Sequence, residues 1–364
     1  MTTAPKAAPH TAVLIGRFQP FHNGHLALLQ QALARAEQVV VVLGSAGQAR
    51  SPKNPFTWQE RAALILASLP NADQARVRCL PMRDFYDEPR WVAAVRAGVQ
   101  ALLPPGGRIA LVGHFKDVSS DYLARFPGWE LASLPRQGDF DATPVRDAYL
   151  GTPTAELAAL WPALETQVPP AVLRFLQEWA RTPQYAEIQQ EWQMIRGYQA
   201  AWSSAPYPPV FVTVDGFVRC NEHLLLVQRG HRPGKGLWAL PGGFVEPRDT
   251  LWQSCLRELQ EETLFPLSET QLRERLQGVE VFDHPDRSLR GRTITHVHAL
   301  DLGDAPGTAL PAVTGGDDAA LARWVPIQDL PSMESQFFED HFHVVRRCME
   351  RFAGWEMPVQ PLHA

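Results

Sequence analysis

The sequence predicts two α/β domains, of which the first has a parallel sheet and the second has a sheet that includes antiparallel strands. Three observations lead to this prediction. Strand-like apolar runs alternate with helical patterns through the first half, as in βαβ units. In the second half, the β-rich runs Val210–Phe217 and His223–Gln228 are close enough to pair as antiparallel strands. The Pro- and Ser-rich stretch Ser203–Pro209 predicts a boundary between domains over residues 1–203 and 204–364.

The composition limits the class of protein. A chain of 364 residues is long enough for two ordinary domains, and 45% hydrophobic with 20% charged residues is typical of a globular protein. The net charge of -5 gives no basic surplus for nucleic acid, and no run of about 18 apolar residues predicts a membrane span. We therefore expect a cytoplasmic protein without nucleic-acid or membrane partners. Its oligomeric state stays open, and a homo-oligomer is possible. Four scattered cysteines are expected to be reduced: Cys79, Cys220, Cys255 and Cys348.

A strand-to-helix turn near the N-terminus predicts a phosphate site. The apolar run Val13–Ile15 suits a buried strand, and leucines at helical spacing follow the turn. Ligands of an open α/β sheet bind at the carboxyl ends of its strands, where the next helix offers free N–H groups. His22 and His25 can direct both imidazoles to one place there. The residues of this turn that we expect to bind or act on a phosphorylated ligand are Gly16, Arg17, Phe18, His22, Gly24 and His25.

The second strand and the loop after it continue the βαβ pattern. The β-branched run Gln38–Leu43 suits a parallel strand that is buried on both faces. The loop over residues 44–55 carries Arg50 and Lys53, and the sequence leaves open whether it clamps a phosphate or is a solvated connection. A capping-box pattern, Thr57-Trp58-Gln59-Glu60, then opens the next helix.

The runs Val77–Pro81 and Arg108–Val112 predict two further strands of the first sheet. Polar residues follow the latter strand at its carboxyl end, and we expect Lys116 among them to belong to a second wall of the phosphate site. From Thr154 to Trp202 the pattern is helical, with aromatic residues that serve as core anchors.

The segment Phe140–Arg146 predicts a second phosphate contact. A hydroxyl and helix-start N–H groups at Thr143, with Arg146 one turn further on, would hold phosphate oxygens. Pro144 suits the first position of this helix. Asp141 puts a carboxylate where a phosphate should approach, which argues against Asp141 as a ligand.

The second half contains a helix with carboxylates on its apolar side, preceded by the Gly-Gly turn Trp238–Gly243. At about 100° per residue, Glu258 and Glu262 fall on the apolar stripe of this helix, with Glu261 at its edge. Clustered carboxylates on a partly buried face call for a cation or for raised pKa values. Because hard oxygen ligands suit Mg²⁺ or Mn²⁺, we expect these three glutamates to bind one of these ions.

The first half resembles the HxGH nucleotidyltransferases, and in particular their nicotinamide mononucleotide (NMN) adenylyltransferases. The stretches that carry this resemblance are Gly16–Pro20, His22–His25, Asn54–Thr57, Glu60–Arg61 and Thr143–Arg146. It implies a Rossmann-like domain that joins NMN to ATP, giving NAD and pyrophosphate. It also implies that Asn54 binds the nucleotide and that Thr143 and Arg146 hold the outer phosphates of ATP.

The second half resembles the Nudix hydrolases. The positions that follow the spacing of the Nudix box are Gly243, Asp249, Arg257-Glu258-Leu259 and Glu261-Glu262. The resemblance implies an α/β/α sandwich with a mixed sheet, in which Arg257 orients the glutamates and Gly243 joins them at the metal. Two positions depart from the box, because Asp249 replaces its first Glu and Leu264 replaces the Gly that ends the helix. A Leu in a left-handed cap would cost on the order of 1 kcal/mol.

A basic loop after the Nudix box resembles the substrate loop of Nudix domains that act on ADP-ribose. Arg287, Arg290 and Arg292 could contact the pyrophosphate or the terminal ribose phosphate, and a solvated basic loop is an equal alternative. The strand Thr293–Leu300 follows this loop. Further on, Asp317-Asp318 stands where such domains often supply another acidic group.

Together the two halves resemble the bifunctional NMN adenylyltransferase/Nudix hydrolase family, from about Thr11 to Arg351. This resemblance implies ATP, NMN and ADP-ribose as substrates, with hydrolysis of ADP-ribose to AMP and ribose 5-phosphate. Three alternatives stay open. The Nudix half could be a non-catalytic nucleotide sensor that regulates the first half, or could act on another nucleoside diphosphate derivative. The first half could transfer its nucleotide to another phosphorylated acceptor.

Overall fold

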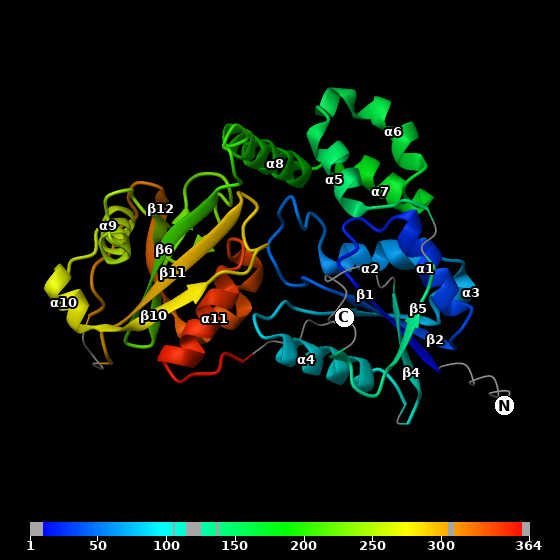
Figure 1. Ribbon diagram of the computed structural model, residues 1–364, viewed down its shortest axis with the longest axis horizontal. Helices are drawn as coiled ribbons and strands as arrows, with labels where there is room; N and C mark the ends of the chain where they lie inside the picture. Colours follow the sequence, from blue (N-terminus) through cyan, green and yellow to red (C-terminus); the bar gives the residue numbers. More distant parts are fainter. Residues whose placement is uncertain (1–9, 105, 114–124, 136–137, 305–308, 359–364) are drawn as a thin grey trace. The chain divides into compact units, whose positions relative to one another are not determined.

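The computed structural model describes residues 10–104, 106–113, 125–135, 138–304 and 309–358, which form two compact units (Figure 1). Unit 1 ends at Gln189 and unit 2 begins at Gln190, within helix α8 (Pro183–Ala201). The boundary after residue 203 that the sequence suggests would assign all of this helix to the first unit. Among the described residues, no helix is both long and apolar enough to cross a membrane.

Unit 1 is built on a five-stranded sheet in the order β3-β2-β1-β4-β5, in which all neighbours are parallel. The strands are β1 (Thr11–Gly16), β2 (Gln38–Leu43), β3 (Val77–Pro81), β4 (Ile109–Gly113) and β5 (Glu130–Ser133). Helices α1 (Asn23–Leu33) and α2 (Trp58–Ala67) lie on one face and α4 (Glu88–Ala101) on the other (Figure 1), while α3 is the short helix Asn71–Gln74. The predicted parallel sheet is therefore confirmed.

The strand order of unit 1 determines where a ligand can bind. From β1 the chain moves outward through β2 and β3, and then returns to β4 on the other side of β1. Open α/β sheets bind ligands in the crevice at the carboxyl ends of the strands where the order reverses in this way. The turn after β1, which contains the two histidines, lies at this switch point.

Four helices follow the sheet of unit 1: α5 (Ala142–Gly151), α6 (Leu157–Glu165), α7 (Pro170–Trp179) and α8. Buried hydrogen bonds join them, since Tyr149 donates to the Leu176 carbonyl at 2.7 Å and Tyr185 donates to the Tyr149 carbonyl at 2.9 Å. Of the aromatic residues expected to be core anchors, Trp179 is buried, whereas Trp202 is 45% exposed and is not a core residue. Phe56, just before α2, packs edge-on against Trp179 of α7 with ring centroids 5.0 Å apart.

Unit 2 contains a mixed sheet in the order β10-β11-β6-β7-β12, to which β8 and β9 add short antiparallel pairings. The strands are β6 (Val210–Cys220), β7 (His223–Arg229), β8 (Trp238–Ala239), β9 (Gly242–Phe244), β10 (Leu276–Phe282), β11 (Arg292–Asp301) and β12 (Ala319–Pro326). Only the β6/β11 pairing is parallel among those in this sheet's described strands. The predicted antiparallel pairing of β6 with β7 is confirmed.

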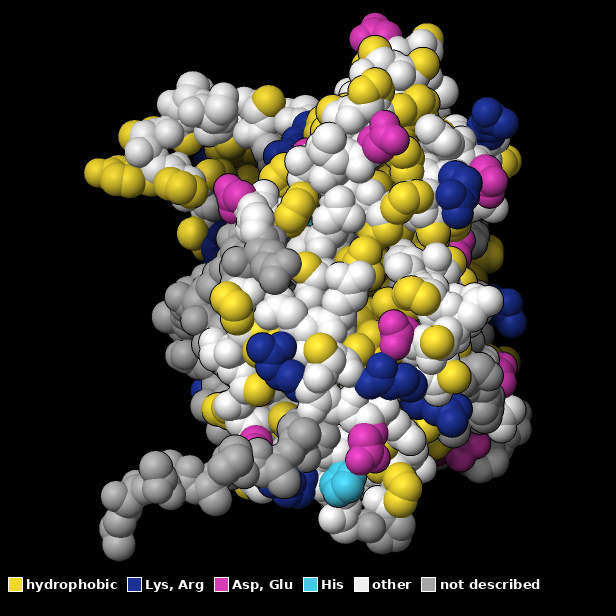
Figure 2. Space-filling view, turned by 90° about the vertical axis from the view of Figure 1, so that its right-hand side faces the viewer, with side chains coloured by type: hydrophobic (Ala, Val, Ile, Leu, Met, Phe, Trp, Pro, Cys, Tyr) yellow, Lys and Arg dark blue, Asp and Glu magenta, His cyan; other side chains and the backbone are white. Residues whose placement is uncertain are grey.

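Two helices cover the two faces of the second sheet and bury separate cores. Helix α9 (Leu251–Thr263) packs through Trp252 and Leu259, with the short helix α10 (Glu269–Glu274) beside it. Helix α11 (His341–Phe352) packs through Val345 and Met349 against the opposite face. This arrangement is the predicted α/β/α sandwich. All four cysteines are free thiols, and three of them are buried. Figure 2 shows acidic and basic side chains interspersed over one face of the molecule, in keeping with the small net charge.

Candidate active sites

In unit 1, His22 and His25 cap the start of α1 reciprocally. His22 Nδ1 accepts from the backbone N–H of His25 at 3.3 Å, and His25 Nδ1 accepts from the backbone N–H of His22 at 3.4 Å. The two rings stack with centroids 3.5 Å apart. Because each Nδ1 is an acceptor, a neutral ring carries its proton on Nε2. A Cβ on Gly24 would lie 3.2 Å from the His22 ring, so glycine here gives that ring room.

The loop between β1 and α1 folds back on itself. Phe18 adopts the left-handed conformation with a φ of 53° and is buried, and its ring packs edge-on against His25 at 4.8 Å. A Cβ on Gly16 would come within 3.0 Å of the Phe18 ring. Glycine at this position is therefore explained by the Phe18 ring, in addition to any approach of a phosphate.

Arg146 is held over the loop by two hydrogen bonds. It donates to the Gln19 carbonyl at 2.6 Å and to Thr143 Oγ1 at 3.2 Å. Burial lowers the pKa of Arg146 to about 10, and the nearby positive charge of Arg17 acts in the same direction. Arg17 is exposed, and no carboxylate among the described residues forms an ion pair with it. Two guanidinium groups at the end of β1 attract an anion.

The start of α5 differs from the prediction. The helix begins at Ala142, so Pro144 is its third residue and not its first. Asp141 is the N-cap and accepts from the backbone N–H of Thr143 at 2.9 Å. The carboxylate thus caps the helix, because an aspartate side chain is well suited to accept from these N–H groups. This explains an acidic residue beside a proposed phosphate site.

Two buried residues that the sequence reasoning did not single out stabilise this loop. Gln19, 1% exposed, donates to the Phe56 carbonyl at 2.8 Å and accepts from the Phe56 N–H at 3.1 Å. Arg61, also 1% exposed, donates to the carbonyls of Arg17 at 2.6 Å and Gly44 at 2.8 Å. Both lie inside quoted motifs, but their partners are 17 to 44 positions away, so spacing alone could not reveal these contacts.

The loop over residues 44–55 is fastened to α2. Arg50 forms a two-pronged ion pair with Glu60, at 2.7 and 2.8 Å, and also donates to the Pro55 carbonyl. It is therefore a structural residue of the loop in this arrangement. Asn54 is buried and donates to Gln48 Oε1 at 2.8 Å. Lys116 lies outside the described residues, as does most of the polar segment that follows β4.

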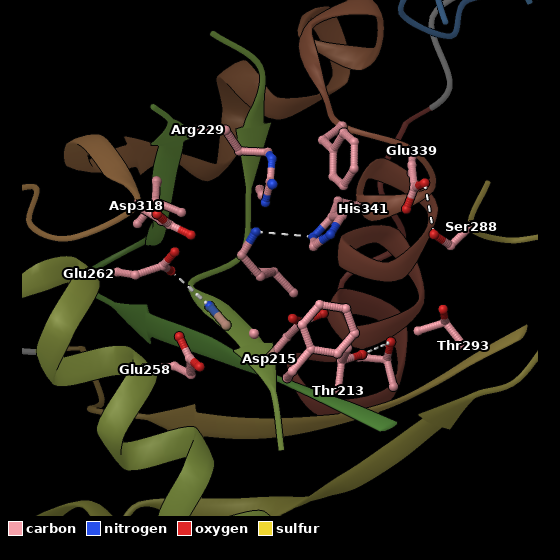
Figure 3. Close-up of a pocket in the computed structure, with 18 of the residues that line it drawn as sticks. Thr213, Asp215, Arg229, Glu258, Glu262, Ser288, Thr293, Asp318, Glu339 and His341 are labelled. Atoms are coloured by element: carbon pink, nitrogen blue, oxygen red, sulfur yellow. Dashed lines mark hydrogen bonds between the residues drawn. The ribbon is translucent and has the colours of Figure 1, made fainter. Parts of the chain in front are cut away.

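In unit 2, a cavity of about 260 Å³ opens between α9 and the start of α11 (Figure 3). One wall carries carboxylates of α9, including Glu258 and Glu262. The lining also contains Arg229 and Arg290, which are basic, and the aromatic ring of Phe244. A pocket with acidic, basic and aromatic walls suits a metal-bound nucleoside diphosphate.

The α9 carboxylates approach the Gly-Gly turn closely. Glu262 is 5% exposed, and its Oε2 accepts from the Gly242 N–H at 2.9 Å. A Cβ on Gly243 would lie 2.5 Å from Glu258 Oε1, so a side chain at this position would collide with that carboxylate. Burial raises the pKa of Glu262 to about 8 and also raises the pKa of Glu258. The predicted placement of these two glutamates on the buried stripe is confirmed.

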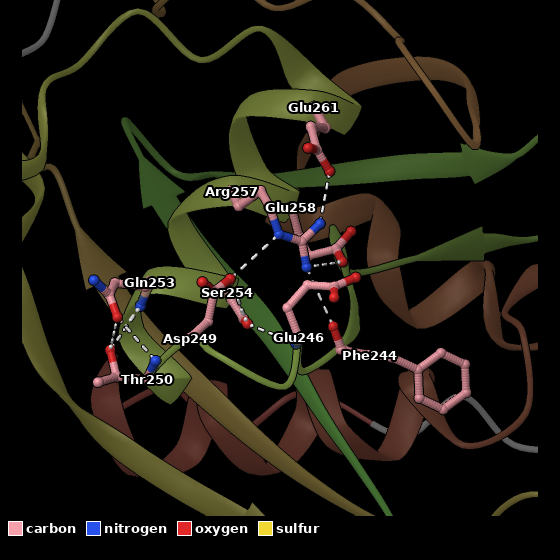
Figure 4. A network of polar contacts seen from close by, with 9 residues as sticks. All are labelled: Phe244, Glu246, Asp249, Thr250, Gln253, Ser254, Arg257, Glu258 and Glu261. Carbon is pink, nitrogen blue, oxygen red and sulfur yellow. Dashed lines mark hydrogen bonds and ion pairs between the residues drawn. The ribbon is translucent and has the colours of Figure 1, made fainter.

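Arg257 orients the other carboxylates of the helix (Figure 4). It donates to Glu261 at 2.7 Å, to Glu258 at 2.9 Å and to the Phe244 carbonyl at 3.3 Å. Its contact with Asp249, the shorter acid that replaces the first Glu of the Nudix box, is long at 3.5 Å. Within the described ranges, no three His, Cys, Asp or Glu side chains are close enough to hold a metal as they stand.

Helix α9 ends on Leu264 in the left-handed conformation, with φ 50° and ψ 41°. The helix therefore keeps the cap that glycine usually provides, although a side chain occupies it. Leu264 is 54% exposed, so its side chain gains little from packing there.

The three arginines of the basic loop occupy different environments. Arg287 forms a two-pronged ion pair with Asp340, at 2.8 and 3.0 Å, and donates to Thr295. Arg290 lines the cavity and lies 5.0 Å above the Phe244 ring. Arg292 is not among the residues that line this cavity and donates to the Asp283 carbonyl.

Several residues that line the cavity were not found from the sequence. They are Asp215 and Thr213 of β6, Arg229 of β7, and Ser288, Glu339 and His341. Burial raises the pKa of Asp215 to about 7. An acid within the apolar run of β6 was a usable signal, whereas Glu339 and His341 stand in no motif. Asp317 and Asp318 also line the cavity.

Comparisons with known proteins match both halves of the chain. A cytidylyltransferase-like model matches residues 13–78, and a NUDIX domain model matches residues 210–348. The chain is 37% identical over 181 residues to a nicotinamide/nicotinic acid mononucleotide adenylyltransferase of Acinetobacter baylyi, covering 50% of this chain and 92% of the relative. It is 36% identical over 139 residues to an ADP-ribose pyrophosphatase of Methanocaldococcus jannaschii, covering 38% and 72%.

The fold and the two sites thus define a protein with a nucleotidyltransferase domain followed by a Nudix domain. A solved structure has both in the same order: a bifunctional NMN adenylyltransferase/ADP-ribose pyrophosphatase from Francisella tularensis, complexed with AMP and a manganese ion. It superposes with a TM-score of 0.86 at 34% identity, over 94% of this chain and 99% of that one. The chain belongs to the family of bifunctional NMN adenylyltransferase/ADP-ribose pyrophosphatases.

Proposed function

We propose that unit 1 transfers AMP from ATP to NMN, giving NAD and pyrophosphate, and that unit 2 hydrolyses ADP-ribose to AMP and ribose 5-phosphate. The observation that carries this proposal is the presence of two separate clusters of polar and charged residues on one chain, each of which suits a phosphorylated ligand. One contains stacked histidines beside two arginines, and the other contains carboxylates beside a Gly-Gly turn. The match to the Francisella tularensis enzyme over 94% of the chain supports the same pair of reactions.

In the transfer reaction, a phosphate oxygen of NMN attacks the α-phosphorus of ATP. A new P–O bond forms between this oxygen and the α-phosphorus. The bond between the α-phosphorus and the oxygen that bridges the α- and β-phosphates breaks, and pyrophosphate leaves. The nucleophile is already an anion, so positioning and charge stabilisation suffice. His22 and His25 would donate from Nε2 to the phosphate oxygens, and Arg146 with Thr143 would hold the leaving pyrophosphate.

The remaining predicted residues support this site. Gly16 and Phe18 shape the loop, Gly24 leaves room for the His22 ring, and Arg17 adds a positive charge. Asn54 and Lys116 keep their proposed role in nucleotide binding. We infer that Mg²⁺ or Mn²⁺ accompanies ATP, as phosphoryl transfer generally requires.

The residues of unit 2 fit a divalent cation. Glu258 and Glu262 provide hard oxygen ligands, Glu261 stands at the edge of the cluster, and Gly243 leaves its backbone close to Glu258. The cation, Mg²⁺ or Mn²⁺, would neutralise the diphosphate and make water a stronger nucleophile. Arg257 would keep the glutamates in place, and one glutamate would take the proton of the attacking water. Arg290 and Arg287, which line the cavity, would bind the substrate, whereas Arg292 of the same loop lies outside the lining.

Product analysis tests the proposal. The purified chain with Mg²⁺ is offered ATP with NMN, nicotinate mononucleotide or pantetheine phosphate in separate tubes, and ADP-ribose in another. NAD from the first mixture, with AMP and ribose 5-phosphate from the last, would support both activities. ADP-ribose that binds but is not cleaved would instead indicate a sensor. Transfer to pantetheine phosphate in place of NMN would refute the proposed acceptor.

A further inference from the structure

Glu339 and His341, on either side of Asp340 where α11 begins, lie on the wall of the cavity that faces the α9 glutamates (Figure 3). Glu339 has a φ of 44°, so the backbone turns sharply at this point. The side chains of Glu339 and His341 line the cavity, whereas the Asp340 carboxylate pairs with Arg287. Neither lining residue belongs to the Nudix box or to its carboxylate cluster.

The Glu339 carboxylate is oriented through one of its oxygens. Oε1 accepts from Ser288 Oγ at 3.0 Å and from the Leu289 N–H at 3.2 Å. Oε2 has no hydrogen-bond partner among the residues that the structure describes. Because the protein fixes the carboxylate through Oε1, Oε2 is available to a ligand in the cavity as an acceptor of fixed direction.

His341 offers a donor beside this acceptor. Its Nδ1 accepts from the Leu240 N–H at 3.2 Å, which leaves the proton of a neutral ring on Nε2. Burial lowers the pKa of His341 to about 3. The negative charge of Asp340 acts to raise this pKa, and the positive charges of three arginines act to lower it: Arg287, Arg229 and Arg290. His341 is therefore a neutral N–H donor throughout the physiological pH range.

This pair of groups suits hydroxyls better than phosphates. A carboxylate repels a diphosphate, whereas Arg229 and Arg290, which line the same cavity, attract it. Burial raises the pKa of Glu339, and the nearby charge of Arg290 acts in the opposite direction and favours the carboxylate form. A vicinal diol can donate one hydroxyl hydrogen to Glu339 and accept from His341 with the other hydroxyl. Carboxylates recognise ribose hydroxyls in this way in dinucleotide sites.

We propose that Glu339 and His341 bind the vicinal hydroxyls of a ribose of the nucleoside diphosphate substrate and thereby select for it. This inference rests on the proposed hydrolysis of ADP-ribose and specifies which residues recognise the sugar. ADP-ribose contains a ribose on either side of its diphosphate, and both present the same diol. The experiment must therefore distinguish the adenosine ribose from the terminal ribose.

The test compares kcat/KM for three substrates: ADP-ribose, an analogue without the 2′ and 3′ hydroxyls of the adenosine ribose, and an analogue without those of the terminal ribose. Glu339→Gln keeps an oxygen for Ser288 and Leu289 but removes the charge. His341→Asn keeps an oxygen that can accept from the Leu240 N–H, but its shorter side chain has no donor at the position of Nε2. Glu222→Gln is the matched control, because Glu222 also has a positive φ, of 58°, and is exposed outside the cavity. The melting temperature of each variant reports on folding.

Glu339→Gln is expected to lower kcat/KM for ADP-ribose by about 10–100-fold, because it removes a hydrogen bond to a charged group. His341→Asn removes a bond between neutral groups and is expected to lower it by about 3–10-fold. With the analogue that lacks the hydroxyls bound by Glu339 and His341, the variants and the wild type should be equally slow. The analogue that shows this result identifies the bound ribose. An equal loss on all three substrates, or no loss on ADP-ribose, would overturn the inference. A wild-type chain that leaves ADP-ribose intact would instead refute the proposed hydrolysis on which the inference rests.

Discussion

The site of unit 1 and the site of unit 2 use their polar groups in opposite ways. In unit 1, the groups around the loop are already matched: the histidines cap each other, and the guanidiniums of Arg61 and Arg146 donate to backbone carbonyls. In unit 2, Glu258 and Glu262 lie close to each other, and burial raises the pKa of both. The first site is already preorganised, and the proposed cation would complete the second.

The largest expected effect tests the preorganised site. Asn is a good helix N-cap, so His22→Asn keeps an acceptor for the His25 N–H while it removes Nε2. We expect kcat/KM for NAD synthesis to fall by about 10²–10³-fold, as when a donor to a transition state is lost. Steady-state kinetics with ATP and NMN measures this effect. Near-normal synthesis would mean that His22 serves only as a cap.

A smaller effect is expected from the support of this site. Gln19→Met keeps the volume of the buried side chain but removes both hydrogen bonds to Phe56. The main-chain carbonyl of Gln19 accepts from Arg146, so a shift of the loop would also displace the Arg146 guanidinium. The change should therefore lower kcat for NAD synthesis by about tenfold, the equivalent of roughly 1.4 kcal/mol. In a double-mutant cycle with Arg146→Lys, the two losses should be less than additive. Fully additive losses would mean that Gln19 does not act through Arg146.

Unit 2 should show the opposite relation between stability and activity. The pKa of Glu262 is raised to about 8 in the folded chain from an ordinary value of 4.5, so folding favours its protonated form. The associated stability is present below about pH 4.5 and is lost as the pH rises through 8. In metal-free buffer, Glu262→Gln should therefore raise the melting temperature relative to the wild type more at pH 9 than at pH 5, by about 2–4 °C per kcal/mol.

The matched control for this change is Glu261→Gln on the same helix, where the side chain is 42% exposed. It should leave the pH dependence of the melting temperature close to that of the wild type. If the melting temperature of Glu262→Gln depended on pH as that of the wild type does, burial of the Glu262 carboxylate would not oppose folding.

The smallest effect concerns the end of α9. Leu264 occupies a left-handed cap, so Leu264→Gly should increase the free energy of unfolding by about 1 kcal/mol. Urea denaturation measures this change. Because Leu264 does not line the cavity, hydrolysis of ADP-ribose should stay as in the wild type. A loss of stability would mean that the Leu264 side chain contributes packing that exceeds its backbone strain.

The same contrast explains what the sequence could predict. Strand β2 was predicted with the observed bounds, because a buried parallel strand produces a continuous apolar run. Strand β3 was also predicted with its observed bounds. The stripe of Glu258 and Glu262 also followed from helical periodicity alone. These features depend on neighbours within a few residues along the chain.

The residues that were missed depend on partners far away in the sequence. Gln19 lies within a motif, yet its role is visible only through Phe56, 37 positions further on. Glu339 and His341 reach the cavity because the start of α11 meets the loop around Ser288, some 51 positions earlier. The start of α5 was misplaced because Asp141 was evaluated as a ligand and not as a cap.

The central claim is that each site on this chain carries out its own reaction. The most direct measurement assays NAD synthesis and ADP-ribose hydrolysis in the same samples of the wild type, His22→Asn and the double variant Glu261→Gln, Glu262→Gln. We predict that His22→Asn loses synthesis and keeps hydrolysis, while the double variant loses hydrolysis and keeps synthesis. Hydrolysis that persists without the glutamates, or loss of both activities in either variant, would contradict the account.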